Sequence, residues 1–276
     1  MGFLARHPDA AAAVLEEQRV DVAADFLAEI PARLGGPVLA RMMPFQASRC
    51  LIEVEPEAAA GLVREMPHAV AATSLRQWPA SKREQLLERL PSRLAFTLRL
   101  LLGYPGTAVG AWMDPRPALL PAGEDAASAL ERLRLEDGEI DRVVFVINRE
   151  QKLEGQVRFG ALLRAGGRTP LSALLEAVPT AVPARAALIE LRDHPVWDGP
   201  DPVPVLSRDG RVVGALRYAD LRRGLAAAHD QGRGAPGDSL VNLADGSWIG
   251  MARILEGVLR ILPPARPPAP PPEKKP

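Results

Sequence analysis

Apolar residues recur along the first hundred positions in groups about twelve residues apart, and each group ends at a proline. These prolines are Pro31, Pro44, Pro56, Pro67, Pro79 and Pro91. The fifth, fourth and first positions before each proline are Phe26, Leu27, Ile30; Leu39, Ala40, Met43; Leu51, Ile52, Glu55; Leu62, Val63, Met66; Ser74, Leu75, Trp78; and Leu86, Leu87, Leu90. All but Glu55 and Ser74 are apolar, and such positions share one face of a helix. The pattern predicts a short helix with one buried face in each unit.

Proline position explains how these helices are separated. Proline disfavours helix in the residue before it and is tolerated in the first turn of the next helix. The longer gap between Pro8 and Pro31 leaves room for one unmarked boundary near Arg19. A unit of about twelve residues cannot bury its apolar face alone, so stacked units are expected. We therefore predict an α-solenoid over residues 1–103, against the alternative of an irregular helical domain with chance spacing.

After Tyr104 the pattern changes to short strands and helices that occur twice. The first copy predicts a helix at 124–134, strands in "VVFVI" and "KLEGQV" around a polar turn at 148–152, and a helix at 159–165. The second copy predicts a helix at 184–193, strands "PVPVL" and "RVVGAL" around a turn at 207–210, and a helix at 217–228. The expected fold class is therefore α followed by α/β.

Two sets of motifs resemble one known family. The N-terminal part has the segment 21–27, "DVAADFL", and short predicted helices separated by prolines that follow an apolar residue, as in "LP". In these features it resembles the N-terminal cytoplasmic domain of MgtE-type magnesium transporters. The flagellar rotor protein FliG has a related helical fold. The duplicated segments "VVFVINREQKLEGQV" and "PVPVLSRDGRVVGALRYADL" resemble a tandem CBS pair, or Bateman module, and "YPGTAVGAWM" resembles the junction between the two parts in MgtE.

The resemblance implies a domain organisation. We expect a helical domain at 1–103 and a CBS pair at 104–228, with copies at 104–166 and 167–228. The remaining expectations are a flexible linker at 229–246, an amphipathic helix at 247–262 that docks on protein or lies peripherally on a membrane, and a disordered proline-rich tail at 263–276.

Magnesium sensing is the first binding function that the resemblance implies. MgtE is a channel whose cytoplasmic domains bind Mg²⁺, a hard cation held by carboxylates and water. The candidate ligands here are Asp21, Asp25 and Asp209, although the helix expected at 67–73 has no carboxylate. For Asp21 and Asp25 the alternative is a solvent-facing position favoured by the dipole at a helix start.

Adenine-nucleotide binding is the second implied function. CBS pairs use an Asp at the start of the last helix, three residues after Thr or Ser, to contact ribose. Asp220 matches this position, but Arg217 replaces the hydroxyl residue and is a candidate phosphate contact. In the first copy Ala161 stands where the Asp belongs. The alternative for Asp220 is a surface position on the helix.

Composition narrows the remaining function classes. Lys plus Arg and Asp plus Glu are equal at 34 each, which gives no basic face for nucleic acid. A single Cys excludes an internal disulfide, and no apolar run is long enough to span a membrane or resembles a secretory signal. The four His residues have no metal-site spacing, and we find no catalytic constellation. The glycine-rich segment 232–240 is interpreted as linker.

These observations together predict a soluble, cytoplasmic, MgtE-like regulatory protein without channel activity of its own. It is expected to sense Mg²⁺ or an adenine nucleotide and to form a homodimer through the CBS pair. The alternative is an interaction scaffold without a ligand, whose helical domain holds a protein partner. A FliG-like role is a remote third.

Overall fold

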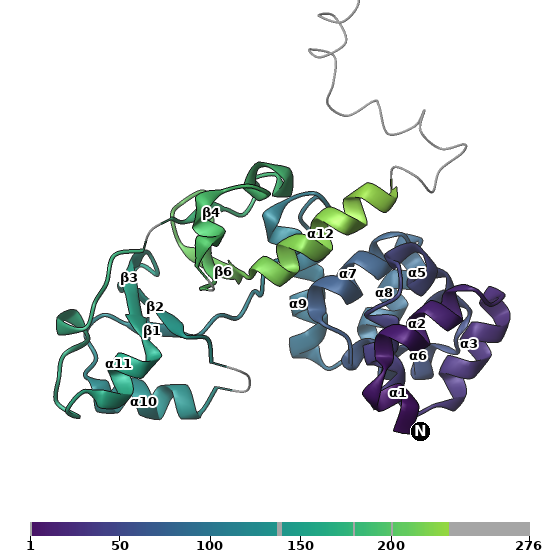
Figure 1. Ribbon diagram of the computed structural model, residues 1–276, viewed down its shortest axis with the longest axis horizontal. Coiled ribbons are helices and arrows are strands. Elements are labelled where there is room, and N and C mark those ends of the chain that lie inside the picture. The colour runs from purple at the N-terminus through teal and green to yellow at the C-terminus, as the bar shows by residue number, and fades with distance from the viewer. Residues whose placement is uncertain (1, 137–139, 179, 200, 232–276) are drawn as a thin grey trace, which may run out of the picture. The chain divides into compact units, whose positions relative to one another are not determined.

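The computed structural model describes residues 2–136, 140–178, 180–199 and 201–231 of the 276-residue chain (Figure 1). Its first part consists of short helices in sequence order. They are α1 (Gly2–Arg6), α2 (Pro8–Glu16), α3 (Val20–Glu29), α4 (Ala32–Leu39), α5 (Pro44–Glu53), α6 (Pro56–Arg64), α7 (His68–Arg76), α8 (Ala80–Glu88) and α9 (Ser92–Leu102). The prediction of short helices is confirmed.

The prolines of the repeat lie at the corners between helices, as predicted. Pro44 and Pro56 are first residues of their helices, whereas Pro67 and its equivalents are the residue just before the helix. Arg19 marks the boundary that lacks proline, and its φ of −62° and ψ of 144° resemble the −55° and 134° of Pro67. Pro37 departs from the pattern because it lies inside α4, where it lacks the N–H that a helix interior uses.

The helices stack in alternating order, which is the solenoid arrangement. α3 packs against α5, α5 against α7 and α7 against α9, while α4 packs between α2 and α6. The predicted apolar faces supply the core, and Leu27, Leu51 and Leu75 are each at most 1% exposed. Phe26 and Met43 are predicted to be buried but are 38% and 42% exposed.

The second part contains two small sheets with the same strand order. The first copy comprises β1 (Leu119–Pro121), α10 (Ala126–Arg134), β2 (Val143–Ile147), β3 (Leu153–Arg158) and α11 (Phe159–Arg164). The second comprises β4 (Val182–Pro183), β5 (Val203–Leu206), β6 (Val212–Leu216) and α12 (Tyr218–Gln231). Short 3₁₀ helices are η1 (Val109–Ala111), η2 (Leu171–Ala173), η3 (Leu188–Leu191) and η4 (Pro195–Asp198).

Each sheet has a parallel pair followed by an antiparallel pair. The orders are β1-β2-β3 and β4-β5-β6, and the antiparallel ladders are irregular at the equivalent positions Val146/Ile147 and Val205/Leu206. The predicted duplication is therefore confirmed at the level of strand order and register.

The prediction of a helix at 184–193 is wrong. Only η3 forms within this range, because the backbone before it makes hydrogen bonds to distant segments. The N–H of Ala184 donates to the carbonyl of Leu206 (2.8 Å), and the carbonyls of Ala184 and Ala186 accept from the N–H groups of Gly110 (2.7 Å) and Val109 (2.9 Å). A helix would need these groups for its own ladder.

Each copy is completed by a segment that comes before the other copy. Asp114, which precedes β1, exchanges backbone hydrogen bonds of 2.7 and 2.9 Å with Ala215 of β6. Glu176, which precedes β4, exchanges hydrogen bonds of 2.9 and 2.8 Å with Gln156 of β3. The two copies are therefore joined by reciprocal pairing of main chain.

One half-buried arginine joins the helical part to the segment that follows it. Arg76 of α7 donates from its Nη atoms to the carbonyls of Leu101 (3.1 Å), Leu102 (3.1 Å) and Tyr104 (2.7 Å). Arg76 thus adds hydrogen bonds to carbonyls at and just after the end of α9, where the helical ladder runs out. Burial lowers the pKa of Arg76.

The predictions for the C-terminal residues lie mostly outside the described residues. Within the range 229–246, residues 229–231 continue α12. The amphipathic helix at 247–262 and the tail at 263–276 lie outside the described residues. No helix in the described ranges is long and apolar enough to cross a membrane.

Candidate functional site

A polar cleft of about 420 Å³ lies where the start of α12 meets the segment before β1. Its lining includes Trp112 and Asp114 from that segment, Asp220 from α12, and His68 at the start of α7. Residues from the helical part and from both CBS-like copies therefore contribute to one cavity. Its volume lies in the range typical of small-molecule sites.

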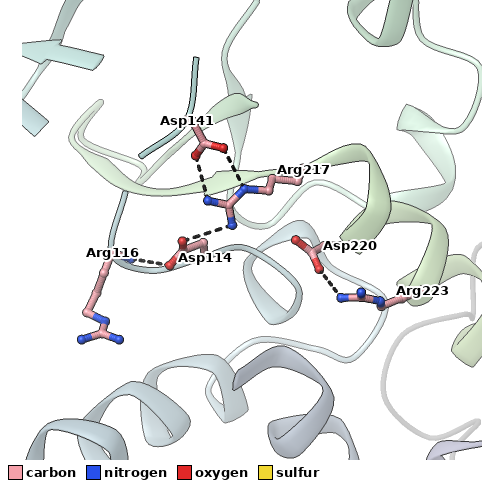
Figure 2. A network of polar contacts seen from close by, with 6 residues as sticks. All are labelled: Asp114, Arg116, Asp141, Arg217, Asp220 and Arg223. Carbon is pink, nitrogen blue, oxygen red and sulfur yellow. Dashed lines mark hydrogen bonds and ion pairs between the residues drawn. The ribbon is translucent and has the colours of Figure 1, made fainter. Parts of the chain in front are cut away.

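An arginine between two carboxylates forms one wall of this cleft (Figure 2). Arg217 lies between β6 and α12, and its Nε and Nη2 donate to the two carboxylate oxygens of Asp141 at 3.0 and 2.8 Å. Its Nη1 lies 3.4 Å from an oxygen of Asp114. The hydrogen bond to Asp141 is the main cause that raises the pKa of Arg217. We call this arrangement the Arg217 clasp.

Asp220 lies in the first turn of α12, on the same cleft wall. Its side chain is 17% exposed, and one carboxylate oxygen accepts a hydrogen bond from Arg223 at 3.0 Å. Burial raises the pKa of Asp220, although Arg223 and Arg217 oppose this shift. The cleft thus holds a largely buried carboxylate with one oxygen outside the ion pair.

Cationic side chains outnumber acidic ones around the cleft. The lining arginines are Arg93, Arg116, Arg217 and Arg223, and the lining acids are Asp114, Glu136 and Asp220. The backbone N–H of Arg116 donates to Asp114 at 3.0 Å, but its guanidinium has no partner among the described residues and points away from the network (Figure 2). Burial, followed by the charge of Arg116, lowers the pKa of His68. The guanidinium of Arg116 in the lining therefore favours an anionic ligand.

The structure places the predicted metal ligands apart from this cleft. Asp21, in the first turn of α3, is exposed and makes a paired interaction with Arg19 at 3.1 and 2.7 Å. Asp25 is exposed on the same helix. Asp209, in the turn between β5 and β6, accepts a hydrogen bond from Ser207 at 2.6 Å and lies 2.9 Å from Arg211.

These acids do not assemble into a cation site within the described part of the chain. No group of three or more His, Cys, Asp or Glu side chains that could hold a metal ion occurs there. The roles of Asp21, Asp25 and Asp209 remain predictions.

The first copy has a clasp at the equivalent position. Arg158, at the end of β3, donates from Nε to both carboxylate oxygens of Glu176 at 3.1 and 3.0 Å and lies 3.9 Å from Asp201. We call this the Arg158 clasp. Three residues after Arg158 stands Ala161, which is half-buried and cannot provide a carboxylate.

Sequence reasoning found Asp220 and Arg217 but missed Asp114 and Asp141. The signal was internal: an Asp stands two residues before β2 in "DRVVFV" and two residues before β5 in "DPVPVL". Aligning the two copies on these strands would have placed Asp141 one position away from Asp201. It would not have shown that each contacts the arginine of the other copy.

Comparisons with known proteins show what the first part and the fold resemble. Residues 6–107 match the family model of the MgtE intracellular N domain. The solved cytosolic domain of the Mg²⁺ channel MgtE in complex with ATP is similar, with a TM-score of 0.69 and 21% identity over 78% of this chain and 89% of that chain. The soluble part of a magnesium transporter matches with a TM-score of 0.57 and 18% identity over 83% of this chain and 95% of that chain. No curated protein matches the chain.

Residues 6–107 thus resemble the MgtE intracellular N domain, and the described chain has the fold of the MgtE cytosolic region. The predicted fold class, a helical solenoid followed by a CBS-like pair, is confirmed.

Proposed function

We propose that this chain is a regulatory protein of the MgtE type and that the cleft beside Asp220 binds an adenine nucleotide. The observation that supports this most strongly is the position of Asp220, a largely buried carboxylate on a cleft wall that also presents arginines. The similar MgtE cytosolic domain was solved with ATP, which makes the nucleotide the natural first ligand to test. Regulation rather than catalysis is the proposed role.

The residues divide between the two ends of such a ligand. The free carboxylate oxygen of Asp220 can accept hydrogen bonds from ribose hydroxyl groups. Arg116 is placed to bind phosphate oxygens, because guanidinium groups donate to them in paired geometry. Arg217 was predicted as a phosphate contact, but it already binds Asp141 and Asp114. We propose that it holds the cleft wall in position.

Magnesium enters this proposal through the nucleotide. Mg²⁺ in proteins is commonly held by one or two carboxylates together with substrate phosphates. The alternative, in which Asp21, Asp25 or Asp209 senses free Mg²⁺, remains open to the same titrations.

Because its lining comes from both parts of the chain, the cleft could couple ligand binding to the arrangement of the helical part and the CBS-like pair. Its walls come from α7, from the segment before β1 and from α12, so a bound nucleotide would contact the helical part and the CBS-like pair together. A ligand shifts a conformational equilibrium only by its different affinity for the two states. Bridging contacts of this kind would provide that difference.

Isothermal titration calorimetry on the full chain tests the proposal. ATP, AMP and MgCl₂ are titrated separately into the wild type, Asp220→Asn and Asp193→Asn. Asp193 is an exposed carboxylate outside the cleft and serves as the matched control. We expect ATP binding to weaken at least about tenfold in Asp220→Asn, because ribose hydrogen bonds to a charged acceptor are lost. Two results would contradict nucleotide sensing through this cleft. One is an unchanged ATP affinity in Asp220→Asn, and the other is a wild type that binds MgCl₂ but neither ATP nor AMP.

A second candidate function is a scaffold that holds a protein partner on the helical domain. Val22 and Phe26 are 51% and 38% exposed on α3, and Phe45 is 47% exposed on the neighbouring helix α5. Exposed apolar side chains of this size often mark protein interfaces. Val22→Ser/Phe26→Ser should lose a partner that the wild type captures and that Leu163→Ser retains, since Leu163 is equally exposed on α11. Identical capture by all three proteins would exclude this surface.

We also propose a homodimer through the CBS pair and the domain limits of 1–103 and 104–228. Light scattering with size-exclusion chromatography on the full chain measures the oligomeric state directly. A monomer at all accessible concentrations would exclude the dimer.

A further inference from the structure

A second cavity, of about 610 Å³, lies between the end of α9 and the second CBS-like copy. The nucleotide cleft and this cavity share no lining residue. We call it the α9 pocket. We propose that the α9 pocket binds a small organic anion that has an apolar body and a doubly charged group such as phosphate.

The position of the α9 pocket in the sheet supports a ligand site. Strands β4 and β5 are parallel, with Pro183 opposite Leu206 at their ends. The pocket is lined by Pro183 and Leu206 themselves and by the residues that follow them. It therefore lies at the carboxyl ends of the parallel strands, where open sheets commonly bind ligands.

Three arginines from three different elements line the α9 pocket. Arg185 follows β4, Arg208 lies in the turn after β5, and Arg99 belongs to α9. Arg99 is paired with Glu84, but among the described residues the side chains of Arg185 and Arg208 have no hydrogen-bond or ion-pair partner. Two guanidinium groups are thus available to bind an anion in paired geometry.

The rest of the lining is mostly apolar. Leu100, Tyr104, Ala184 and Leu206 line the cavity and are buried or half-buried. A free inorganic anion would leave this surface uncovered, whereas an organic anion would cover it and also neutralise the arginines. The volume fits a small molecule rather than a protein segment. An acidic peptide is the competing occupant and is an outcome of the test below.

The test uses 1-naphthyl phosphate, whose naphthyl ring and phosphate dianion match the two parts of the pocket. Its binding to the full chain is measured by calorimetry, with 1-naphthol and inorganic phosphate as probes that each keep one part. The variant Arg185→Gln/Arg208→Gln removes the two unpaired guanidinium groups. Arg164→Gln/Arg192→Gln is the charge-matched control, because both arginines are exposed, lie outside the pocket and have no partner among the described residues.

We expect the wild type to bind 1-naphthyl phosphate at least about tenfold more tightly than it binds 1-naphthol or inorganic phosphate. We also expect the Arg185→Gln/Arg208→Gln variant to bind 1-naphthyl phosphate at least about tenfold more weakly than the wild type does. The control variant and Asp220→Asn should bind it as the wild type does, which separates this pocket from the nucleotide cleft. The proposal is overturned by no binding at probe concentrations up to about 10 mM, or by equal loss in both double variants. Tighter binding of a poly-glutamate peptide than of 1-naphthyl phosphate would assign the pocket to an acidic protein segment and would also overturn it.

Discussion

The two CBS-like copies share their framework but differ in the chemistry placed on it. Each has the same strand order, the same irregular position in its antiparallel ladder and an arginine clasp at the end of its last strand. Asp220 follows that arginine in the second copy, whereas Ala161 follows it in the first. The shared features hold the copies together, so ligand chemistry is expected only where the copies differ.

This comparison also changes the interpretation of Arg217. Arg158 occupies the equivalent position and binds Glu176, the counterpart of Asp114, although no carboxylate follows it at position 161. A feature that is present in both copies is better explained by joining them than by a ligand that only one copy is equipped to bind. We therefore assign Arg217 the role of joining the two copies through the clasp. It contributes to the cleft by holding the cleft wall in position.

The largest expected effect concerns two equivalent glycines. A Cβ on Gly155 would lie 2.7 Å from the carbonyl oxygen of Glu176, and a Cβ on Gly214 would lie 2.7 Å from that of Asp114. Because backbone blocks the added methyl group, Gly155→Ala and Gly214→Ala should each lower the free energy of unfolding by about 1–3 kcal/mol. Urea unfolding monitored by circular dichroism measures both.

Matched controls exist in each copy. Gly123 and Gly199 have open space around the same position, so Gly123→Ala and Gly199→Ala should change the free energy of unfolding by less than about 0.5 kcal/mol. A neutral Gly155→Ala beside a costly Gly214→Ala would show that the reciprocal pairing matters in only one copy.

The next effect is the coupling within the Arg217 clasp. A double-mutant cycle of Arg217→Gln and Asp141→Asn should give about 1 kcal/mol of coupling, since the pairing is bidentate and both side chains are only partly exposed, at 37% and 26%. Thermal and urea unfolding of the four proteins measure it. Additive effects of the two substitutions would argue against the clasp as a stabilising contact.

Asp220 should make stability depend on pH. Burial raises the pKa of Asp220 above its ordinary value of 3.8, so the folded state holds the proton more tightly than the unfolded state. Its contribution to stability is fully present below pH 3.8 and is lost as the pH rises through the folded pKa. Relative to Asp220→Asn, the wild type should lose stability as the pH rises through this window.

Unfolding of both proteins across this range checks the sign. A wild type that gains stability relative to Asp220→Asn as the pH rises would contradict the direction. Ala161→Asp adds the missing carboxylate to the first copy, so its stability can be compared with that of the wild type over the same pH range.

The smallest expected effect is the coupling within the Arg158 clasp. Arg158 and Glu176 are 50% and 42% exposed, so solvent screening should reduce their coupling to about 0.3 kcal/mol. The cycle of Arg158→Gln and Glu176→Gln, measured as for the other clasp, ranks the two. A coupling as large as that of Arg217 with Asp141 would mean that exposure does not separate them.

Local sequence rules predicted the helical part well because its structure is set locally. Proline fixes its own φ and restricts its predecessor, so Pro56 and Pro67 mark corners whatever the rest of the chain does. Even Arg19, identified by spacing alone, adopts the same backbone conformation. The exposure of Phe26 was missed because it depends on how neighbouring helices cover the side chain, which spacing alone does not give.

The candidate site was only half predictable because its partners come from distant segments. Asp220 and Arg217 are neighbours in sequence, but Asp114 and Asp141 reach them through pairing between the copies. The failed helix at 184–193 has the same origin, since Ala184 and Ala186 bond to residues 109–110. Long-range main-chain pairing overrode local helical preference there.

The reciprocal main-chain pairing through Asp114 and Glu176 limits which fragments of the polypeptide can be expressed separately. A fragment that ends between the two copies would lack the segment that pairs with β3, and one that begins there would lack the segment that pairs with β6. Each half would expose an unpaired strand edge of the kind that promotes aggregation. Expression of this region therefore calls for boundaries that keep both crossing segments in one polypeptide.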